Sequence, residues 1–136
     1  MSPSAELSCV PPDKVPLLWP HMSHYIRRAM ERGQMGEFAD VERDVLCANS
    51  YLWVAVLDGA ILAAAVTKVT SGDERLCTIV ACGGYDWDRF GHLIEGLEKY
   101  ARAEGCTSIE ICGRPGWMRR LKDYRLRKIV IRKELA

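Results

Sequence analysis

Apolar and polar residues follow a helical period in the first third of this chain. Apolar side chains recur at helical spacing over residues 18–30, and Gly33 then interrupts the pattern. The same spacing returns over residues 38–46, which are followed by Asn49 and Ser50, residue types that favour turns. We therefore expect two amphipathic helices, a longer one followed by a shorter one.

The pattern changes at residue 51, where long apolar runs predict strands. Residues 51–57 and 60–67 flank Asp58-Gly59, a dipeptide that favours the two-residue turn of an antiparallel hairpin. A further apolar run over residues 76–84 ends in Gly83-Gly84 and predicts a third strand. Together these runs predict a three-stranded antiparallel meander.

The second half of the chain alternates between helix and strand signals. Residues 90–101 carry the most regular helical pattern, and Gly105 is placed to cap that helix at its C-terminus. Residues 107–112 predict a strand, a short helix follows the turn at residues 113–116, and residues 125–135 predict a last strand that closes the sheet. This order predicts an α/β (α+β) fold whose mixed, mostly antiparallel sheet is flanked by about four helices.

We expect a single domain over residues 1–136, with residues 1–14 as an N-terminal extension or an edge strand. A chain of 136 residues, 49% of them hydrophobic, can bury one substantial core. Its 19 basic and 18 acidic residues nearly cancel, so no overall field attracts nucleic acid or an anionic membrane. The basic run at residues 119–128 alternates with apolar positions, which is typical of a strand with one exposed face and does not favour nucleic-acid binding.

Cysteine and histidine spacing does not indicate a metal site. The six cysteines form no Cys-x-x-Cys pair, so we expect six free thiols. His21 and His24 share the first predicted helix, but no third ligand accompanies them. No apolar run approaches the roughly 18 residues of a membrane span, and we expect a cytoplasmic protein. The sequence is compatible with both a monomer and a homo-oligomer.

The order of elements, together with the segment EKYARAEGCTSIEI at residues 98–111, resembles the GNAT superfamily of N-acetyltransferases. The resemblance covers residues 15–133 and implies transfer of an acetyl group from acetyl-CoA to an amine, whose identity it does not give. It also implies that one strand aligns the cofactor and that the start of the next helix holds its phosphates. The residues that this assigns to cofactor binding are Ile79, Val80, Ala81, Cys82, Gly83, Gly84, Arg89, Phe90, Gly91 and His92.

Departures from the family pattern set a second hypothesis beside the first. The phosphate-binding loop would fall at residues 85–90, which contain no glycine, and Asp86 and Asp88 add negative charge there. The position of the family's catalytic tyrosine holds Leu121. The Gly-Gly strand end at residues 83–84, the aspartate-tryptophan loop and Gly-Arg-Pro-Gly-Trp at residues 113–117 together resemble small GNAT-like proteins encoded by bacteriophages and prophages. The alternative function is therefore a non-enzymatic, phage-associated structural or interaction protein that lost cofactor binding, which could be virion-associated in a host cytoplasm.

Three residues are weak candidates for moving a proton in an acetyl transfer. Glu42 lies on the second predicted helix and His92 at the start of the third, where both are equally explained as solvated surface residues. Tyr124 precedes the last predicted strand, where side-chain packing is the simpler explanation.

A cleft is expected beside the strand at residues 76–84. Because a Gly-Gly end weakens strand packing, we expect the sheet to open there, toward residues 107–113. Arg114 and Trp117 lie at the adjoining turn, where an arginine can bind an anion and a tryptophan can cover an apolar ligand. These two residues are the candidates for contacting a substrate or a partner.

Overall fold

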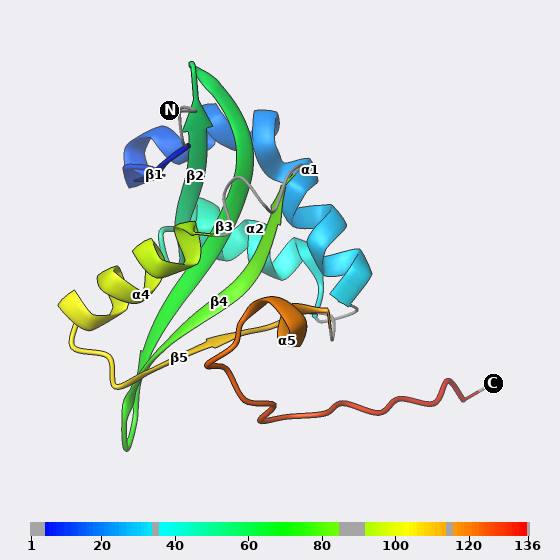
Figure 1. Cartoon of the computed structure of the whole chain (residues 1–136). Coiled ribbons are helices and arrows are strands. Elements are labelled where there is room, and N and C mark those ends of the chain that lie inside the picture. The colour runs from blue at the N-terminus through cyan, green and yellow to red at the C-terminus, as the bar shows by residue number, and fades with distance from the viewer. Residues whose placement is uncertain (1–4, 34–35, 85–91, 114–115, 136) are drawn as a thin grey trace.

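A single five-stranded sheet organises the computed structural model, which describes residues 5–33, 36–84, 92–113 and 116–135. The strands lie in the order β1-β2-β3-β4-β5, and only the β4–β5 pair is parallel. Helices α1 and α2 cover one face of the sheet, and α4 covers the other (Figure 1). The mixed, mostly antiparallel α+β fold expected from the sequence is therefore confirmed.

The strands are β1 (Glu6–Cys9), β2 (Tyr51–Leu57), β3 (Ala60–Ser71), β4 (Arg75–Gly84) and β5 (Ser108–Ile111). The helices are the 3-10 turn η1 (Pro12–Lys14), α1 (Val15–Gly33), α2 (Phe38–Leu46), α4 (Leu93–Ala103) and the short α5 (Trp117–Arg120). Strand β1 pairs with β2 and lies at one edge of the sheet, and β5 lies at the other.

The β2–β3 hairpin forms as its turn sequence predicts. Asp58 and Gly59 both have positive φ, 51° and 79°, as the turn that favours Asp-Gly requires. Leu57 and Ala60 pair across this turn. The hairpin brings two apolar strands together in the middle of the sheet, where both faces are covered.

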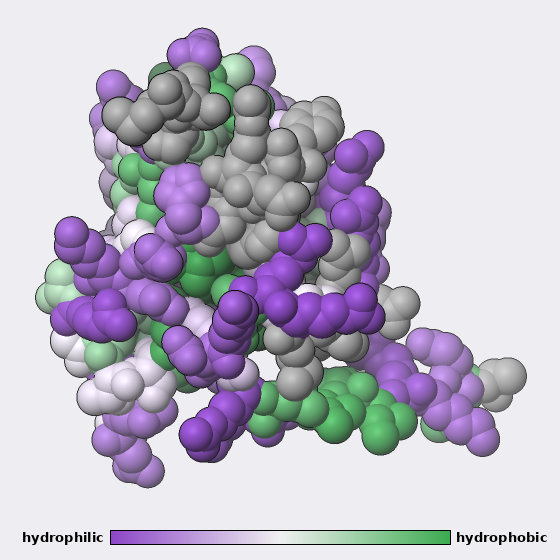
Figure 2. All heavy atoms as spheres, viewed as in Figure 1, coloured by the Kyte–Doolittle hydropathy of each residue, from purple (hydrophilic) through white to green (hydrophobic). Residues whose placement is uncertain are grey.

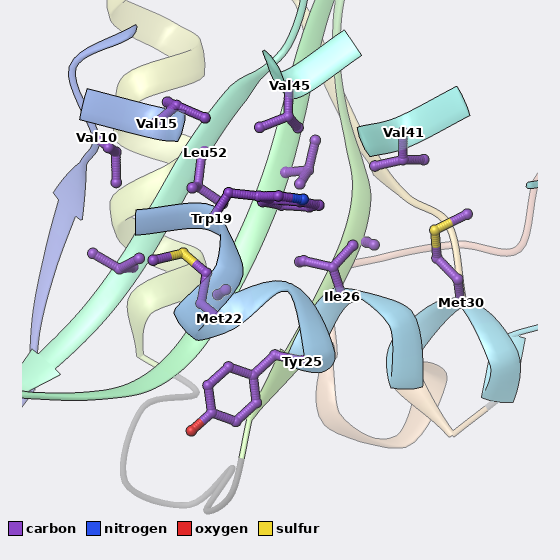
Figure 3. Packing of buried hydrophobic residues seen from close by; sticks show 14 residues of the cluster. Val10, Val15, Trp19, Met22, Tyr25, Ile26, Met30, Val41, Val45 and Leu52 are labelled. Carbon is purple, nitrogen blue, oxygen red and sulfur yellow. The ribbon is translucent and has the colours of Figure 1, made fainter. Parts of the chain in front are cut away.

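The larger core cluster lies between the sheet and helices α1 and α2 (Figure 3). Alternate residues of β2 and β3, such as Leu52, Val54 and Val66, face α1, whose side chains Met22 and Ile26 are fully buried. A second cluster on the opposite face joins Trp53, Ile79 and Ile94 with other residues of α4 and the α5 region. The period of two in the strands thus supplies one apolar face to each helix layer.

The C-terminal segment corrects one prediction from the sequence. Residues 125–135 were expected to close the sheet as a strand, but the structure contains no helix or strand there, and every one of these residues is exposed. The segment runs away from the body of the protein (Figure 1), and Figure 2 shows a hydrophobic patch on it. Alternating apolar residues favour an extended chain, but a strand also requires a partner, and the sheet ends at β5.

All six cysteines are free thiols. No group of His, Cys, Asp or Glu in the described part of the chain could hold a metal ion. No described helix is long and apolar enough to cross a membrane.

Candidate functional site

Strands β4 and β5 separate halfway along β4 and leave an opening in the sheet. Their parallel pairing runs from Leu76 with Ser108 to Ile79 with Ile111, and the last bond joins the Cys112 N–H to the Ile79 carbonyl at 3.0 Å. From Ala81 to Gly84, β4 pairs with β3 and not with β5. This is the opening expected from the sequence between residues 76–84 and 107–113.

A β-bulge, and not the glycine pair, accounts for the separation. Thr67 pairs with Ile79 and Val66 pairs with Ala81, so Val80 is an extra residue in β4. A bulge bends its strand and increases the local twist, which turns the end of β4 away from β5. Gly83 and Gly84 remain paired with β3. The opening predicted from the sequence is therefore present, but the cause predicted for it, a weak Gly-Gly strand end, is wrong.

Gly83 serves a different purpose, because it lets α1 approach β4 closely. A Cβ at this position would lie 2.6 Å from the carbonyl oxygen of Tyr25 and 3.3 Å from the Cβ of Ala29. Such distances are shorter than van der Waals contact, so no larger residue fits without moving the helix. The close approach places the next turns of α1 beside the opening.

The opening forms a cavity of about 130 Å³ between α1, the ends of β4 and β5, and α5. Helix α1 contributes residues at positions i, i+3, i+4 and i+7, which lie on one face of a helix. The described lining residues are Tyr25, Arg28, Ala29, Arg32, Cys82, Gly83, Gly84, Cys112, Gly113, Gly116, Trp117 and Arg120.

The lining is positively charged. Arg28 and Arg32 reach the cavity from α1 and Arg120 from α5, and no described lining residue is acidic. Guanidinium groups bind carboxylates and phosphates through paired hydrogen bonds, so the cavity is suited to an anionic group. Reasoning from the sequence missed these arginines. The sequence carried one signal, because Arg28 and Arg32 follow Tyr25 at a spacing that places them on one helix face. A solvated helix face shows the same spacing.

Two thiols line the cavity but are poor nucleophiles at neutral pH. Burial raises the pKa of Cys82 to about 12. Burial, followed by the charge of Glu110, also raises the pKa of Cys112, against an opposing effect of Lys128. Because the thiolate is the reactive form, covalent catalysis by either cysteine is not favoured.

The predicted cofactor residues divide into four groups. Cys82, Gly83 and Gly84 line the cavity, whereas Ile79 and Ala81 are buried in the two core clusters and Val80 packs against the larger one. His92 is exposed at the N-terminus of α4. The remaining predictions, Arg89, Phe90 and Gly91, lie outside the described residues, as do the loop aspartates Asp86 and Asp88.

Trp117 lines the cavity from α5. Arg114, which was predicted together with Trp117 to contact a substrate or partner, lies outside the described residues. The indole packs on the backbone of Gly113, where an added Cβ would lie 2.6 Å from the indole nitrogen. Trp117 also packs against the second core cluster. It therefore combines a structural contact with a position in the cavity wall.

Glu42 and Tyr124 do not line the cavity, and each has a hydrogen-bond partner elsewhere. The buried Trp19 indole donates to Glu42 Oε2 at 2.7 Å. The Tyr124 hydroxyl donates to Glu98 Oε2 at 2.7 Å, and burial together with this carboxylate raises the tyrosine pKa. These contacts give both side chains structural roles and leave the proton-transfer group unassigned.

Solved structures of acetyltransferases superpose on nearly the whole chain. An aminoglycoside acetyltransferase, meta-AAC0020, from an uncultured soil metagenomic sample aligns with a TM-score of 0.69 at 14% identity, over 97% of this chain and 96% of that one. The ribosomal-protein-alanine N-acetyltransferase of Brucella melitensis biovar Abortus 2308 gives 0.66 at 10% identity, over 96% and 100%. The chain has the GNAT acetyltransferase fold. A GNAT family acetyltransferase of Staphylococcus aureus gives 0.64 at 11% identity, over 98% of this chain and 100% of that one.

No family model and no curated protein matches the sequence. At identities of 10–14% the structural similarity extends to the GNAT fold alone. The acyl donor and the acceptor must therefore be argued from the residues of this chain.

Proposed function

We propose that this protein is an N-acetyltransferase that binds acetyl-CoA in the opening between β4 and β5. The observation that carries the proposal is the coincidence of an open strand edge with a cationic cavity at the same place. The GNAT fold of the chain supports the same location, since the resemblance assigns the cofactor to the end of β4.

The open edge can hold the amide groups of a coenzyme A arm. From Ala81 to Gly84 one side of β4 pairs with β3, and β5 does not pair with the other side. Backbone N–H and C=O groups at such an edge accept an extended, amide-containing ligand in the manner of an added strand. The pantetheine arm of coenzyme A is a ligand of this kind, and its phosphates match the arginines of the cavity.

The chemistry requires direct attack of a neutral amine on the thioester carbon. An N–C bond forms and the C–S bond breaks, while a base removes the amine proton and coenzyme A leaves as the thiol. Burial and the hydrogen bond to Glu98 raise the pKa of Tyr124, so its phenol stays protonated at neutral pH and cannot act as that base. Glu42 accepts the Trp19 indole and does not line the cavity, and His92 is exposed at the start of α4, so the proposal assigns no residue as the base.

The first experiment measures coenzyme A binding by isothermal titration calorimetry. We expect the wild-type protein to bind, and the double variant Arg28→Glu/Arg32→Glu to bind at least about tenfold more weakly because two attractive charges become repulsive. The matched control is Lys14→Glu/Lys99→Glu, which changes the net charge equally at exposed positions outside the cavity lining and should leave affinity nearly unchanged.

A second ligand separates phosphate binding from binding of the arm. Pantetheine has no phosphates, so the Arg28→Glu/Arg32→Glu variant should bind it as the wild type does if these arginines hold phosphates. If the variant instead loses the same affinity for coenzyme A and for pantetheine, the two arginines contact the pantetheine arm and not the phosphates. No binding of either ligand by the wild-type protein would reject the proposed enzyme.

One observation favours a second candidate, a non-enzymatic, phage-associated interaction or structural protein. Leu121, at the position of the family's catalytic tyrosine, is buried in the second core cluster, with 8% of its surface exposed. A leucine packed in the core thus occupies the position at which the family has the tyrosine that acts as general acid. Under this hypothesis the protein keeps the fold without turnover. Mass spectrometry of an amine library incubated with acetyl-CoA distinguishes the two, because only the enzyme produces acetylated amines. Both candidates are proposed to act in the cytoplasm, the second one also in a virion.

A further inference from the structure

A second, smaller cavity lies between the sheet and the N-terminal half of α4. Its volume is about 20 Å³, which is room for about one group of the size of a water molecule or a methyl group. We call it the apolar cavity, because none of its described lining residues is charged. These residues are Leu7, Trp53, Val54, Ala55, Ala63, Ala64, Ala65, Cys82, Leu93, Ile94 and Leu97.

The sheet carries very small side chains below this part of α4. Ala55 pairs with Ala63, which pairs with Gly84, so one row across three strands has no side chain larger than a methyl group. In the next row Ala65 pairs with Cys82, which is also small. The space between the sheet and the helix follows from this lack of side-chain volume.

The side chains that line the apolar cavity offer little to a water molecule. The Trp53 indole already donates to Thr67 Oγ1 at 2.9 Å. Burial raises the pKa of Cys82 to about 12, so its thiol is uncharged at neutral pH and packs as a small apolar group. A cavity with such walls stays dry and accepts apolar groups.

Cys82 connects the apolar cavity to the cationic cavity of the candidate site. It is the only described residue that lines both. Its side chain packs against the second core cluster, which lies on the α4 face of the sheet. It also belongs to the stretch from Ala81 to Gly84, where β5 does not pair with β4. The thiol therefore lies at the boundary between a charged opening and an apolar space.

We infer that Cys82 limits the length of the acyl chain that the proposed enzyme transfers, and that the apolar cavity takes the end of that chain. The inference rests on the proposed function, because a coenzyme A arm along Ala81 to Gly84 passes beside Cys82. Carbon atoms beyond the acetyl group extend past the thiol, away from the arginines. The reaction is the same for every chain: the amine nitrogen bonds to the acyl carbon, the C–S bond breaks, and coenzyme A leaves as the thiol.

Isothermal titration calorimetry with acetyl-CoA and butyryl-CoA tests this limit. We expect the wild-type protein to bind acetyl-CoA more tightly. Cys82→Ala should shift the ratio of the two affinities at least about fourfold toward butyryl-CoA, the gain for one further methylene group that leaves water. Cys82→Val should shift the ratio in the opposite direction, because it narrows the same passage. The matched control is Cys112→Ala, which removes a thiol that lines the cationic cavity alone and should leave the ratio unchanged.

Unacylated coenzyme A separates this inference from the proposed function. It has no acyl chain, so the wild-type protein and Cys82→Ala should bind it equally, which also shows that the variant is folded. If both bind coenzyme A but the ratio of butyryl-CoA to acetyl-CoA affinity stays the same, the inference is wrong and the proposed function stands. An equal shift in Cys112→Ala would also overturn the inference. If the wild-type protein binds no coenzyme A, the proposed function is rejected and the inference with it.

Discussion

Gly83 has no room for a side chain, because its neighbour is a backbone atom. The oxygen of Tyr25, which would lie 2.6 Å from an added Cβ, belongs to α1 and can move only with the helix. We expect Gly83→Ala to lower the free energy of unfolding by about 1–3 kcal/mol, the usual cost of overpacking. Gly72→Ala is the control, since an added Cβ there meets nothing within 4 Å. Urea denaturation measures both, and an equal, small effect would show that α1 does not approach β4 this closely.

Burial of ionisable side chains predicts a loss of stability at alkaline pH. Burial raises the pKa of Cys77 to about 11 and that of Cys82 and Tyr100 to about 12, from ordinary values of 9.0 and 10.0. The unfolded chain therefore loses these protons first as the pH rises. These groups should not change the free energy of unfolding below pH 9, and they should lower it as the pH rises from 9 toward 12.

Denaturation in urea at pH 7 to 11, with a reductant present, measures this dependence. Tyr100→Phe should make the decline above pH 10 shallower, because the variant has no phenol to ionise at this position. Stability that rises over the same range would contradict the burial of these groups.

The residues of the candidate site were only partly predictable from the sequence. Cys82, Gly83 and Gly84, which the family resemblance assigned to the cofactor, line the cavity, as does Trp117, which was predicted from its place at a strand-to-helix turn. The three arginines were not predicted, since a basic residue on a helix looks the same whether it faces a cavity or solvent. The bulge in β4 and the close approach of α1 to β4 determine which arginines face the cavity, and no local sequence pattern shows either feature.

Helix α4 ends in a hydrogen-bonded cap that depends on Gly105. The Cys106 N–H donates to the Ala101 carbonyl at 2.9 Å and the Gly105 N–H donates to the Arg102 carbonyl at 3.0 Å, while Gly105 has φ of 80°. This is the Schellman arrangement, and it confirms the predicted cap. The cap directs the chain into β5, and so it also positions one wall of the cavity.

We expect Gly105→Ala to destabilise the protein by about 1 kcal/mol, because alanine pays a steric cost at positive φ. Gly105→Asn should cost less, since asparagine tolerates this conformation better. Thermal unfolding followed by circular dichroism compares the two variants. If alanine and asparagine cost the same, the left-handed backbone conformation does not limit stability here.

Elements with a strong local signal were predicted, and those decided by distant contacts were not. The hairpin, the long helix α1 and helix α4 follow directly from turn residues and apolar spacing. The Val80 bulge depends on how β4 fits β3, which no local pattern records. Residues 125–135 have a strand's pattern but pair with no strand in the part of the chain that the structure describes, so the pattern predicted a strand that is not formed.

At the scale of the molecule, the candidate site lies at one end of the sheet. It is lined by α1, the ends of β4 and β5, and α5, so its shape depends on elements that are far apart in the sequence.

The order of strands in the sheet also has a consequence for how the chain folds. Strands β2, β3 and β4 are neighbours both in sequence and in space, so the meander forms from short loops with little entropic cost. The β4–β5 pair is parallel and has helix α4 between its strands, so it closes a much longer loop. We therefore expect the meander to collapse early and β5 to dock late. During synthesis β5 would leave the ribosome after the other four strands of the sheet, so the end of the sheet that holds the cavity matures after the meander.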